Sequence, residues 1–130
     1  YCMGRKKIHL EYLLNATSKN ILWEAISTPS GLEGWFADKV LSDDRRVIFC
    51  WGKNERREAM IVGVRAFAFI RFHWLDAEIE RECFELKMTN NELTNDFVLE
   101  ITDFSAEEEV DDACELWESE VEALRRKCGF

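Results

Sequence analysis

The stretch that decides the fold is residues 105–128, SAEEEVDDACELWESEVEALRRKC. Its apolar side chains recur at steps of three and four residues, which places them on one stripe of a helix with 3.6 residues per turn. The stripe consists of Val110, Cys114, Trp117, Val121, Leu124 and Cys128. We therefore predict one long amphipathic helix that buries a single face.

Both ends of this helix carry signals. Ser105 followed by Glu108 is a capping box, in which each side chain binds a backbone N–H of the first turn, so the helix is predicted to start at Ser105. Acidic residues at 107–109 and 111–112 lie near the positive end of the helix dipole, and the basic residues 125–127 lie near its negative end. Gly129 is placed to end the helix.

The chain upstream of this helix begins with a strand and two short helices. Residues 7–15 alternate in a way that is close to a half-buried strand. Thr17 or Ser18 is suited to cap a helix that runs to about Ser27. Thr28 followed by Pro29 predicts a second helix, which extends to Phe36 and carries Leu32 and Trp35.

The middle of the chain is rich in strand patterns separated by turn residues. We predict strands at about 39–41, 46–51, 56–64, 66–74, 82–89 and 96–104, paired antiparallel, with one face buried and one wet. The predicted fold class is therefore α+β: a curved antiparallel sheet of about six to seven strands, wrapped around the C-terminal helix.

Length and charge limit the possible functions. At 130 residues the chain is expected to form one domain, with residues 1–6 as a loose extension. The net charge of -9 disfavours nucleic acid as a partner, because that binding depends on clustered Lys and Arg. No apolar run is long enough to predict a membrane span, and we expect no signal peptide.

Cysteine usage points to a reducing compartment. The five cysteines are widely spaced and include no C-x-x-C pair, so a disulfide framework is not expected. Cys50, Cys83 and Cys114 fall within apolar patterns, where a free cysteine behaves as a small hydrophobic residue. We expect five free thiols and a cytoplasmic location.

Catalytic and metal-binding motifs give little signal. His9 and His73 lie at solvent-facing positions of their strands without an evident local partner, so we interpret both as surface residues and assign no metal site. The acidic residues 107–112 radiate from their helix and are not expected to converge on a cation. Phosphate-binding loops and serine-hydrolase motifs are absent, and no cofactor is expected.

A few side chains allow two interpretations. Asp103 shares the parity of the buried residues of its strand and could offer a carboxyl group with a raised pKa, although a solvent-facing or capping role is favoured. Tyr12 could direct a hydroxyl group into a cavity or could pack in the core. The same ambiguity, core packing or the wall of a ligand pocket, applies to Trp51, Phe72, Trp74, Phe84 and Trp117.

The order of these elements, with SKNILWEAISTPSGL at 18–32 leading into GWFAD at 34–38, resembles the START-like (Bet v 1-like, SRPBCC) superfamily. It is most similar to the branch related to the activator of the ninety-kilodalton heat-shock chaperone's ATPase. LEITDF at 99–104, followed by Leu116, Trp117 and Leu124, is also similar to small bacterial START-like domains of unknown function.

This resemblance implies a helix-grip fold with a cavity between the sheet and the terminal helix. It implies non-covalent binding of a small hydrophobic or amphipathic ligand, with a co-chaperone-like protein-interaction module and a cyclase- or aromatase-like enzyme as alternatives. We expect the domain to be non-catalytic; its oligomeric state stays open. The candidate cavity residues are Tyr12, Trp35, Phe36, Trp51, Phe72, Trp74, Phe84, Leu86, Leu99, Asp103, Trp117 and Val121.

Overall fold

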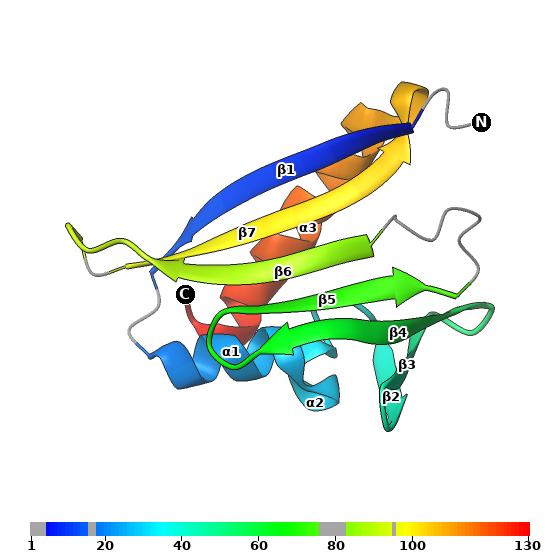
Figure 1. Ribbon diagram of the computed structural model, residues 1–130, viewed down its shortest axis with the longest axis horizontal. Coiled ribbons are helices and arrows are strands. Elements are labelled where there is room, and N and C mark those ends of the chain that lie inside the picture. The colour runs from blue at the N-terminus through cyan, green and yellow to red at the C-terminus, as the bar shows by residue number, and fades with distance from the viewer. Residues whose placement is uncertain (1–4, 16–17, 76–82, 95) are drawn as a thin grey trace.

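A computed structural model describes residues 5–15, 18–75, 83–94 and 96–130. These residues form one curved sheet with a long C-terminal helix, as Figure 1 shows. The strands are β1 (Arg5–Leu14), β2 (Lys39–Asp43), β3 (Arg46–Trp51), β4 (Glu55–Arg65), β5 (Phe69–Trp74), β6 (Cys83–Asn90) and β7 (Phe97–Ala106). The helices are α1 (Lys19–Ser27), α2 (Pro29–Leu32) and α3 (Val110–Cys128), with a 3-10 turn, η1 (Glu107–Glu109), before α3.

The sheet is antiparallel throughout, in the order β1-β7-β6-β5-β4-β3-β2. The predicted α+β helix-grip fold is therefore confirmed. β3 has the predicted bounds, whereas β1 begins two residues earlier than predicted and β5 three residues later, because Ala66–Ala68 form a turn in which Phe67 has a positive φ of 61°. The predicted strand at 82–89 begins at a residue outside the described ranges.

The first and last strands are neighbours and pair along their whole length, from Arg5 with Ala106 to Leu14 with Phe97. Residues that pair directly point to the same side of a sheet, and alternate residues point to opposite sides. Tyr12 and its partner Leu99 therefore share the face that α3 covers, which we call the inner face, while His9 lies on the outer face.

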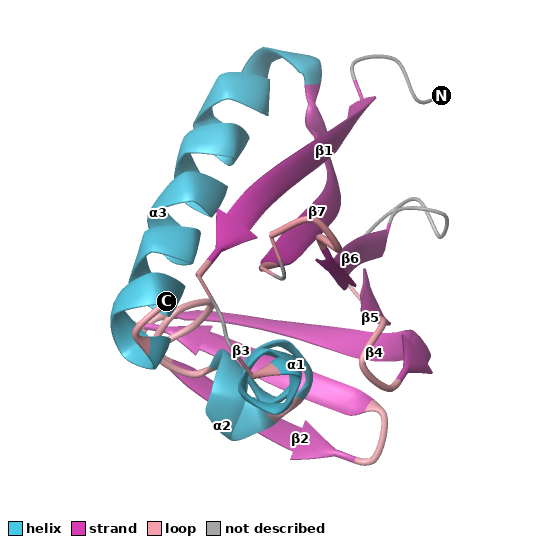
Figure 2. Cartoon of the chain, turned by 90° about the vertical axis from the view of Figure 1, so that its left-hand side faces the viewer, coloured by secondary structure: helices cyan, strands magenta, loops and turns pink. Residues whose placement is uncertain are grey.

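Helix α3 crosses behind β7 and β6 in Figure 1, and Figure 2 shows it standing on one side of the sheet. The predicted stripe is confirmed: Trp117, Val121 and Leu124 are buried, and the outer members of the stripe are partly buried. Gly129 ends the helix in the left-handed conformation, with φ of 75° and its N–H donated to the carbonyl of Arg125.

The predicted start of this helix was wrong. Ser105 belongs to β7, pairs with Lys6 and is buried, and its hydroxyl donates to the carbonyl of Ala106. Neither η1 nor α3 has a side-chain cap. Pairing with β1 satisfies the backbone of Ser105 in the sheet, which prevents Ser105 from acting as the first residue of a capping box.

The two short helices begin where predicted. The hydroxyl of Ser18 accepts from the N–H of Ile21, and that of Thr28 accepts from the N–H of Gly31 at 2.9 Å. However, α2 ends at Leu32 and not at Phe36. The chain leaves the helix at Glu33, which is extended with a ψ of 138°, and Gly34 continues with a φ of 91°, a conformation that glycine adopts at little cost.

The described cysteines, Cys50, Cys83, Cys114 and Cys128, are all free, as predicted, and Cys2 lies outside the described ranges. Within the described residues, no helix combines the length and the apolar character needed to cross a bilayer.

Candidate functional site

The centre of the inner face is filled by aromatic rings. Phe84 on β6 stacks on Phe36 and on Phe72, with ring centroids 5.3 and 4.8 Å apart, and Phe36 stacks on Trp117 of α3 at 5.5 Å. These four side chains are buried. The protein's own rings therefore occupy the middle of the interface between helix and sheet.

The aromatic residues next to this centre are only partly buried. Trp74 stacks on Phe84 at 5.0 Å, and Trp51 donates its indole N–H to the carbonyl of Phe36 at 2.8 Å. The guanidinium carbon of Arg57 lies 3.9 Å from the centroid of a Trp74 ring, a cation–π contact. Arg57 reaches the inner face because it pairs with the buried Phe49 on β3.

Asp103 on β7 contributes a carboxylate to the same face. One of its oxygens accepts from the indole N–H of Trp117 at 2.9 Å, and the other accepts from the backbone N–H of Phe104 at 2.8 Å. The sequence favoured a solvent-facing or capping role for Asp103; in the structure Asp103 is partly exposed and caps neither η1 nor α3. The register of β1 and β7 places Asp103 opposite the buried Ile8, which directs its carboxylate toward α3.

Glu120 on α3 is a site residue that the sequence analysis missed, as is Arg57 on β4. Burial, followed by the nearby negative charge of Asp103, raises the pKa of Glu120 to about 8. A carboxyl group with this pKa is mostly protonated at neutral pH and can donate a hydrogen bond. The spacing could have revealed it, since Glu120 lies three residues after Trp117 and four before Leu124, on the buried stripe.

Tyr12 on β1 faces α3 from the edge of the sheet. Burial is the main cause that raises the pKa of its hydroxyl; Glu118 and Cys114 raise it further, and Arg125 lowers it. The side chain is partly exposed, so its hydroxyl lies between the core and the solvent.

The predicted candidates thus divide into two groups. The buried group forms the core and consists of Trp35, Phe36, Phe72, Phe84, Leu86, Leu99, Trp117 and Val121. The partly exposed group consists of Tyr12, Trp51, Trp74 and Asp103. We call Trp51, Trp74 and Asp103, together with Arg57 and Glu120, the rim. Tyr12 lies apart from the rim, on the edge strand β1, three strands away from β5 and Trp74. Trp35 donates its indole N–H to the carbonyl of Ala25 at 2.9 Å, so it joins the loop after α2 to α1 and lies outside the rim.

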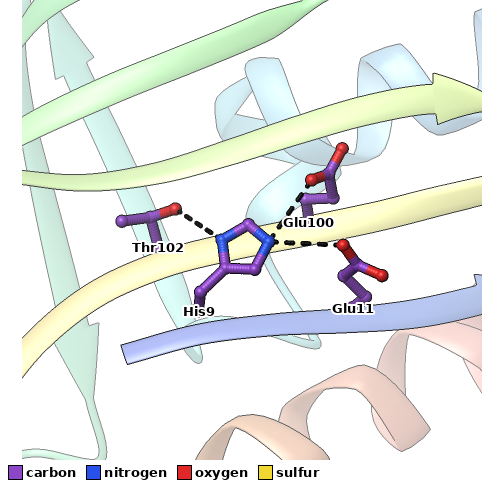
Figure 3. Close-up of polar contacts among 4 residues, drawn as sticks. All are labelled: His9, Glu11, Glu100 and Thr102. Atoms are coloured by element: carbon purple, nitrogen blue, oxygen red, sulfur yellow. Dashed lines mark hydrogen bonds and ion pairs between the residues drawn. The ribbon is translucent and has the colours of Figure 1, made fainter. Parts of the chain in front are cut away.

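A second polar cluster lies on the outer face, as Figure 3 shows. The Nε2 atom of His9 is 3.4 Å from Oε1 of Glu11 and 3.3 Å from Oε1 of Glu100, and its Nδ1 atom is 3.3 Å from Oγ1 of Thr102. His9 is exposed, as predicted, but it has partners that the sequence analysis overlooked. Glu11 is two residues away on the same face, and β7 supplies the other two residues. His73, also predicted to face solvent, is partly buried.

Family comparison agrees with this architecture. Residues 2–130 match the START-like superfamily domain. The chain belongs to the START-like superfamily. A solution structure of BfR322 from Bacteroides fragilis is 70% identical to this START-like domain, over 98% of this chain and 94% of that one, with a TM-score of 0.68.

More distant solved structures share the fold alone. The Aha1 dimer from Colwellia psychrerythraea is 11% identical, with a TM-score of 0.75 over 95% of this START-like domain and 96% of that chain. DynU16, described as a putative protein in the dynemicin biosynthetic locus, is 16% identical, with a TM-score of 0.72 over 92% of this domain and 46% of that chain. Among curated proteins, none matches.

Proposed function

We propose that this START-like domain binds a small amphipathic molecule at the rim, between α3 and the inner face of the sheet. One observation carries the proposal: Trp51 and Trp74 remain partly exposed on the inner face, while Phe36, Phe84 and Trp117 fill the space behind them. Aromatic side chains at the edge of a filled core present apolar area that a ligand can cover.

The polar residues of the rim give the ligand an orientation. Covering the exposed indole surface would contribute roughly 25 cal/mol for each Å² of apolar area buried. Glu120, whose pKa of about 8 keeps it mostly protonated at neutral pH, is suited to donate a hydrogen bond to a ligand oxygen. Asp103 is an acceptor, already oriented by the Trp117 indole, and Arg57 adds positive charge beside Trp74.

Ligand titrations would test this proposal. A panel of fatty acids and planar aromatic acids is added to the full chain while tryptophan fluorescence and amide NMR shifts are recorded. We expect saturable changes centred on Trp51, Trp74 and Glu120. Trp74→Leu should weaken binding at least tenfold, because it removes one of the two partly exposed indole rings of the rim and the ring that Arg57 contacts.

A matched control is available in Trp23→Leu. Trp23 is also partly buried, but it lies on α1 and contacts Phe67, with centroids 6.0 Å apart. The control variant should bind the panel as the wild type does. If no ligand in the panel produces a saturable change, or if both variants weaken binding equally, the rim is not a small-molecule site.

The filled centre of the inner face also favours a second candidate function, a protein-interaction module. The stacked rings from Phe72 to Trp117 fill the centre of the inner face, so the apolar surface for a partner is that of the rim. A protein side chain can cover that surface as well as a small molecule can. In a complex with a co-chaperone-like protein partner, the rim amides would be protected from hydrogen exchange. The same amides and the tryptophan fluorescence of the free domain would not respond to the ligand panel. That pair of results would replace the first proposal with the second.

A further inference from the structure

The cluster on the outer face has the donor set of a metal site. We propose that His9, Glu11 and Glu100 bind a divalent first-row transition ion, with Zn²⁺ the best match. One imidazole nitrogen and two carboxylate oxygens are ligand types that Zn²⁺ accepts, whereas Mg²⁺ and Ca²⁺ select oxygen ligands. The two carboxylates would balance the charge of the ion.

The distances within the cluster agree with this assignment. The ligand atoms of the three residues all lie within 4.8 Å of one another. With bonds of 2.0–2.2 Å to zinc, neighbouring ligand atoms in a tetrahedral site are about 3.3 Å apart. The separations of 3.4 and 3.3 Å from Nε2 to the two carboxylate oxygens are close to this value. Both separations are longer than the 2.7–2.9 Å of a strong charge-assisted hydrogen bond. The geometry therefore fits three ligands around a metal ion better than a direct ion pair between His9 and a carboxylate.

Thr102 contacts the imidazole nitrogen of His9 that does not face the carboxylates. Figure 3 shows Nδ1 facing the Thr102 hydroxyl and Nε2 facing the two carboxylates. With the proton on Nδ1, the ring would donate to the Thr102 hydroxyl at 3.3 Å and would leave the lone pair of Nε2 for the ion. Metal-binding histidines usually have such a partner at the second nitrogen, because it sets both the tautomer and the ring orientation. The ligands sit on two strands that pair over ten positions, so the backbone that carries them is rigid.

The next carboxylate on this face lies outside the cluster. Glu85 on β6 pairs with Thr102 in the sheet, but its side chain is bound by Arg71, with Oε2 2.7 Å from Nη2. Three protein ligands leave a fourth position for water or an exogenous ligand. An ion bound there would also join the first and last strands, β1 and β7, and it would raise the free energy of unfolding with its concentration.

The chain contains only two histidines, which makes the test specific. Zn²⁺ is added to the full-length protein, and the imidazole nitrogen signals and backbone amides are followed by NMR. We expect the Nε2 signal of His9 and the amides near Glu11 and Glu100 to shift, and His73 to stay unchanged. His9→Ala and Glu100→Gln should each lower the Zn²⁺ affinity at least tenfold, and Thr102→Val by about 10-fold through the orientation of the ring. Mg²⁺ should not compete.

Glu85→Gln is the matched control, because it removes a carboxylate from the same face without touching the three ligands. It should leave the affinity unchanged. All of the changed side chains are at the surface or near it, and dispersed amide spectra would show that the variants fold. If Zn²⁺ shifts His73 or the cysteine amides but not His9, or if His9→Ala binds with unchanged affinity, the assignment is wrong.

Discussion

Trp117 and Asp103 join the C-terminal helix to the last strand: the indole N–H of Trp117 donates to the Asp103 carboxylate at 2.9 Å. The two residues lie on either side of the connection between β7 and α3, 14 positions apart. Trp117 is also buried and stacked on Phe36. One side chain therefore fills the core and sets the position of α3 over the inner face.

Trp117→Ala should lower the free energy of unfolding by about 3–5 kcal/mol, because it removes a large buried ring and leaves a cavity. Trp117→Phe should lower the free energy of unfolding by less, because a buried ring remains and only the hydrogen bond to Asp103 and part of the ring are lost. Chemical denaturation of both variants measures the difference. Leu116→Ala, at the exposed neighbouring position, should change stability by no more than about 0.5 kcal/mol. Equal losses at positions 116 and 117 would contradict the burial of Trp117.

Glu120 should make the protein less stable as pH rises. Its pKa is raised from 4.5 to about 8 on folding, so the folded state holds the proton more tightly than the unfolded state. Stability from this group is therefore fully present below about pH 4.5 and is lost progressively as pH rises to about 8. Glu120→Gln, which stays neutral, should flatten this dependence and stabilise the protein at pH 9. Urea midpoints at pH 5 and pH 9 provide the measurement.

The exposed Glu115 on the same helix offers a comparison for that measurement. Glu115→Gln should leave the slope of stability against pH between 5 and 9 as it is in the wild type. A Glu120→Gln variant with the wild-type slope would show that Glu120 is ionised in the folded protein throughout this range.

Lys127 should control the opening of α2 together with the loop of residues 33–37 that follows it. Its ammonium group, at the end of α3, donates to the backbone carbonyls of Ser30, Gly31 and Glu33. Lys127→Met removes these hydrogen bonds, so the amides of residues 32–37 should exchange with solvent at least several-fold faster than in the wild type. Arg126→Met, at the exposed neighbouring position, should not have this effect. Unchanged exchange in Lys127→Met would mean that packing alone holds α2.

Gly31 should tolerate no side chain. A Cβ atom there would lie 1.8 Å from the carbonyl oxygen of Glu24 and 2.7 Å from Oγ1 of Thr28. Gly31→Ala must separate α2 from α1 and should destabilise the protein by about 2–3 kcal/mol, measured by thermal or urea unfolding. At Gly63 on β4 a Cβ would meet its nearest neighbours at 3.5–3.7 Å, so Gly63→Ala should have a much smaller effect. A neutral Gly31→Ala would show that the α1–α2 contact is loose.

Several elements were predictable because their signals are local. Ser18 and Thr28 cap their helices in the structure as the sequence indicates, since a cap needs only a hydroxyl group and the next few N–H groups. Ser105 carries the same kind of signal, yet it is a strand residue because β1, almost 100 residues away in the chain, pairs with it. Local capping and pairing with a distant strand compete for the same backbone groups. The spacing of residues along the chain reveals the capping signal but not the distant pairing.

The candidate sites depend still more on distant residues. The buried stripe of α3 follows from its period, but the raised pKa of Glu120 depends first on its burial in the folded protein and second on the charge of Asp103 on another element. His9 and Glu11 are close in sequence, whereas Glu100 and Thr102 join them only through the register of β1 and β7. Partial exposure of Trp51 and Trp74 likewise results from how far α3 and the aromatic centre cover the sheet.

By itself, the sequence determined the fold class, most of the strands and helices, the buried face of α3 and the START-like resemblance, because periodicity, caps and turn residues act over a few neighbouring positions. The tertiary structure alone decided where α3 begins, which aromatic residues are core and which form the rim, and which charged groups meet. Those outcomes depend on strand register and on desolvation by distant segments, and neither is encoded in the spacing of residues along the chain.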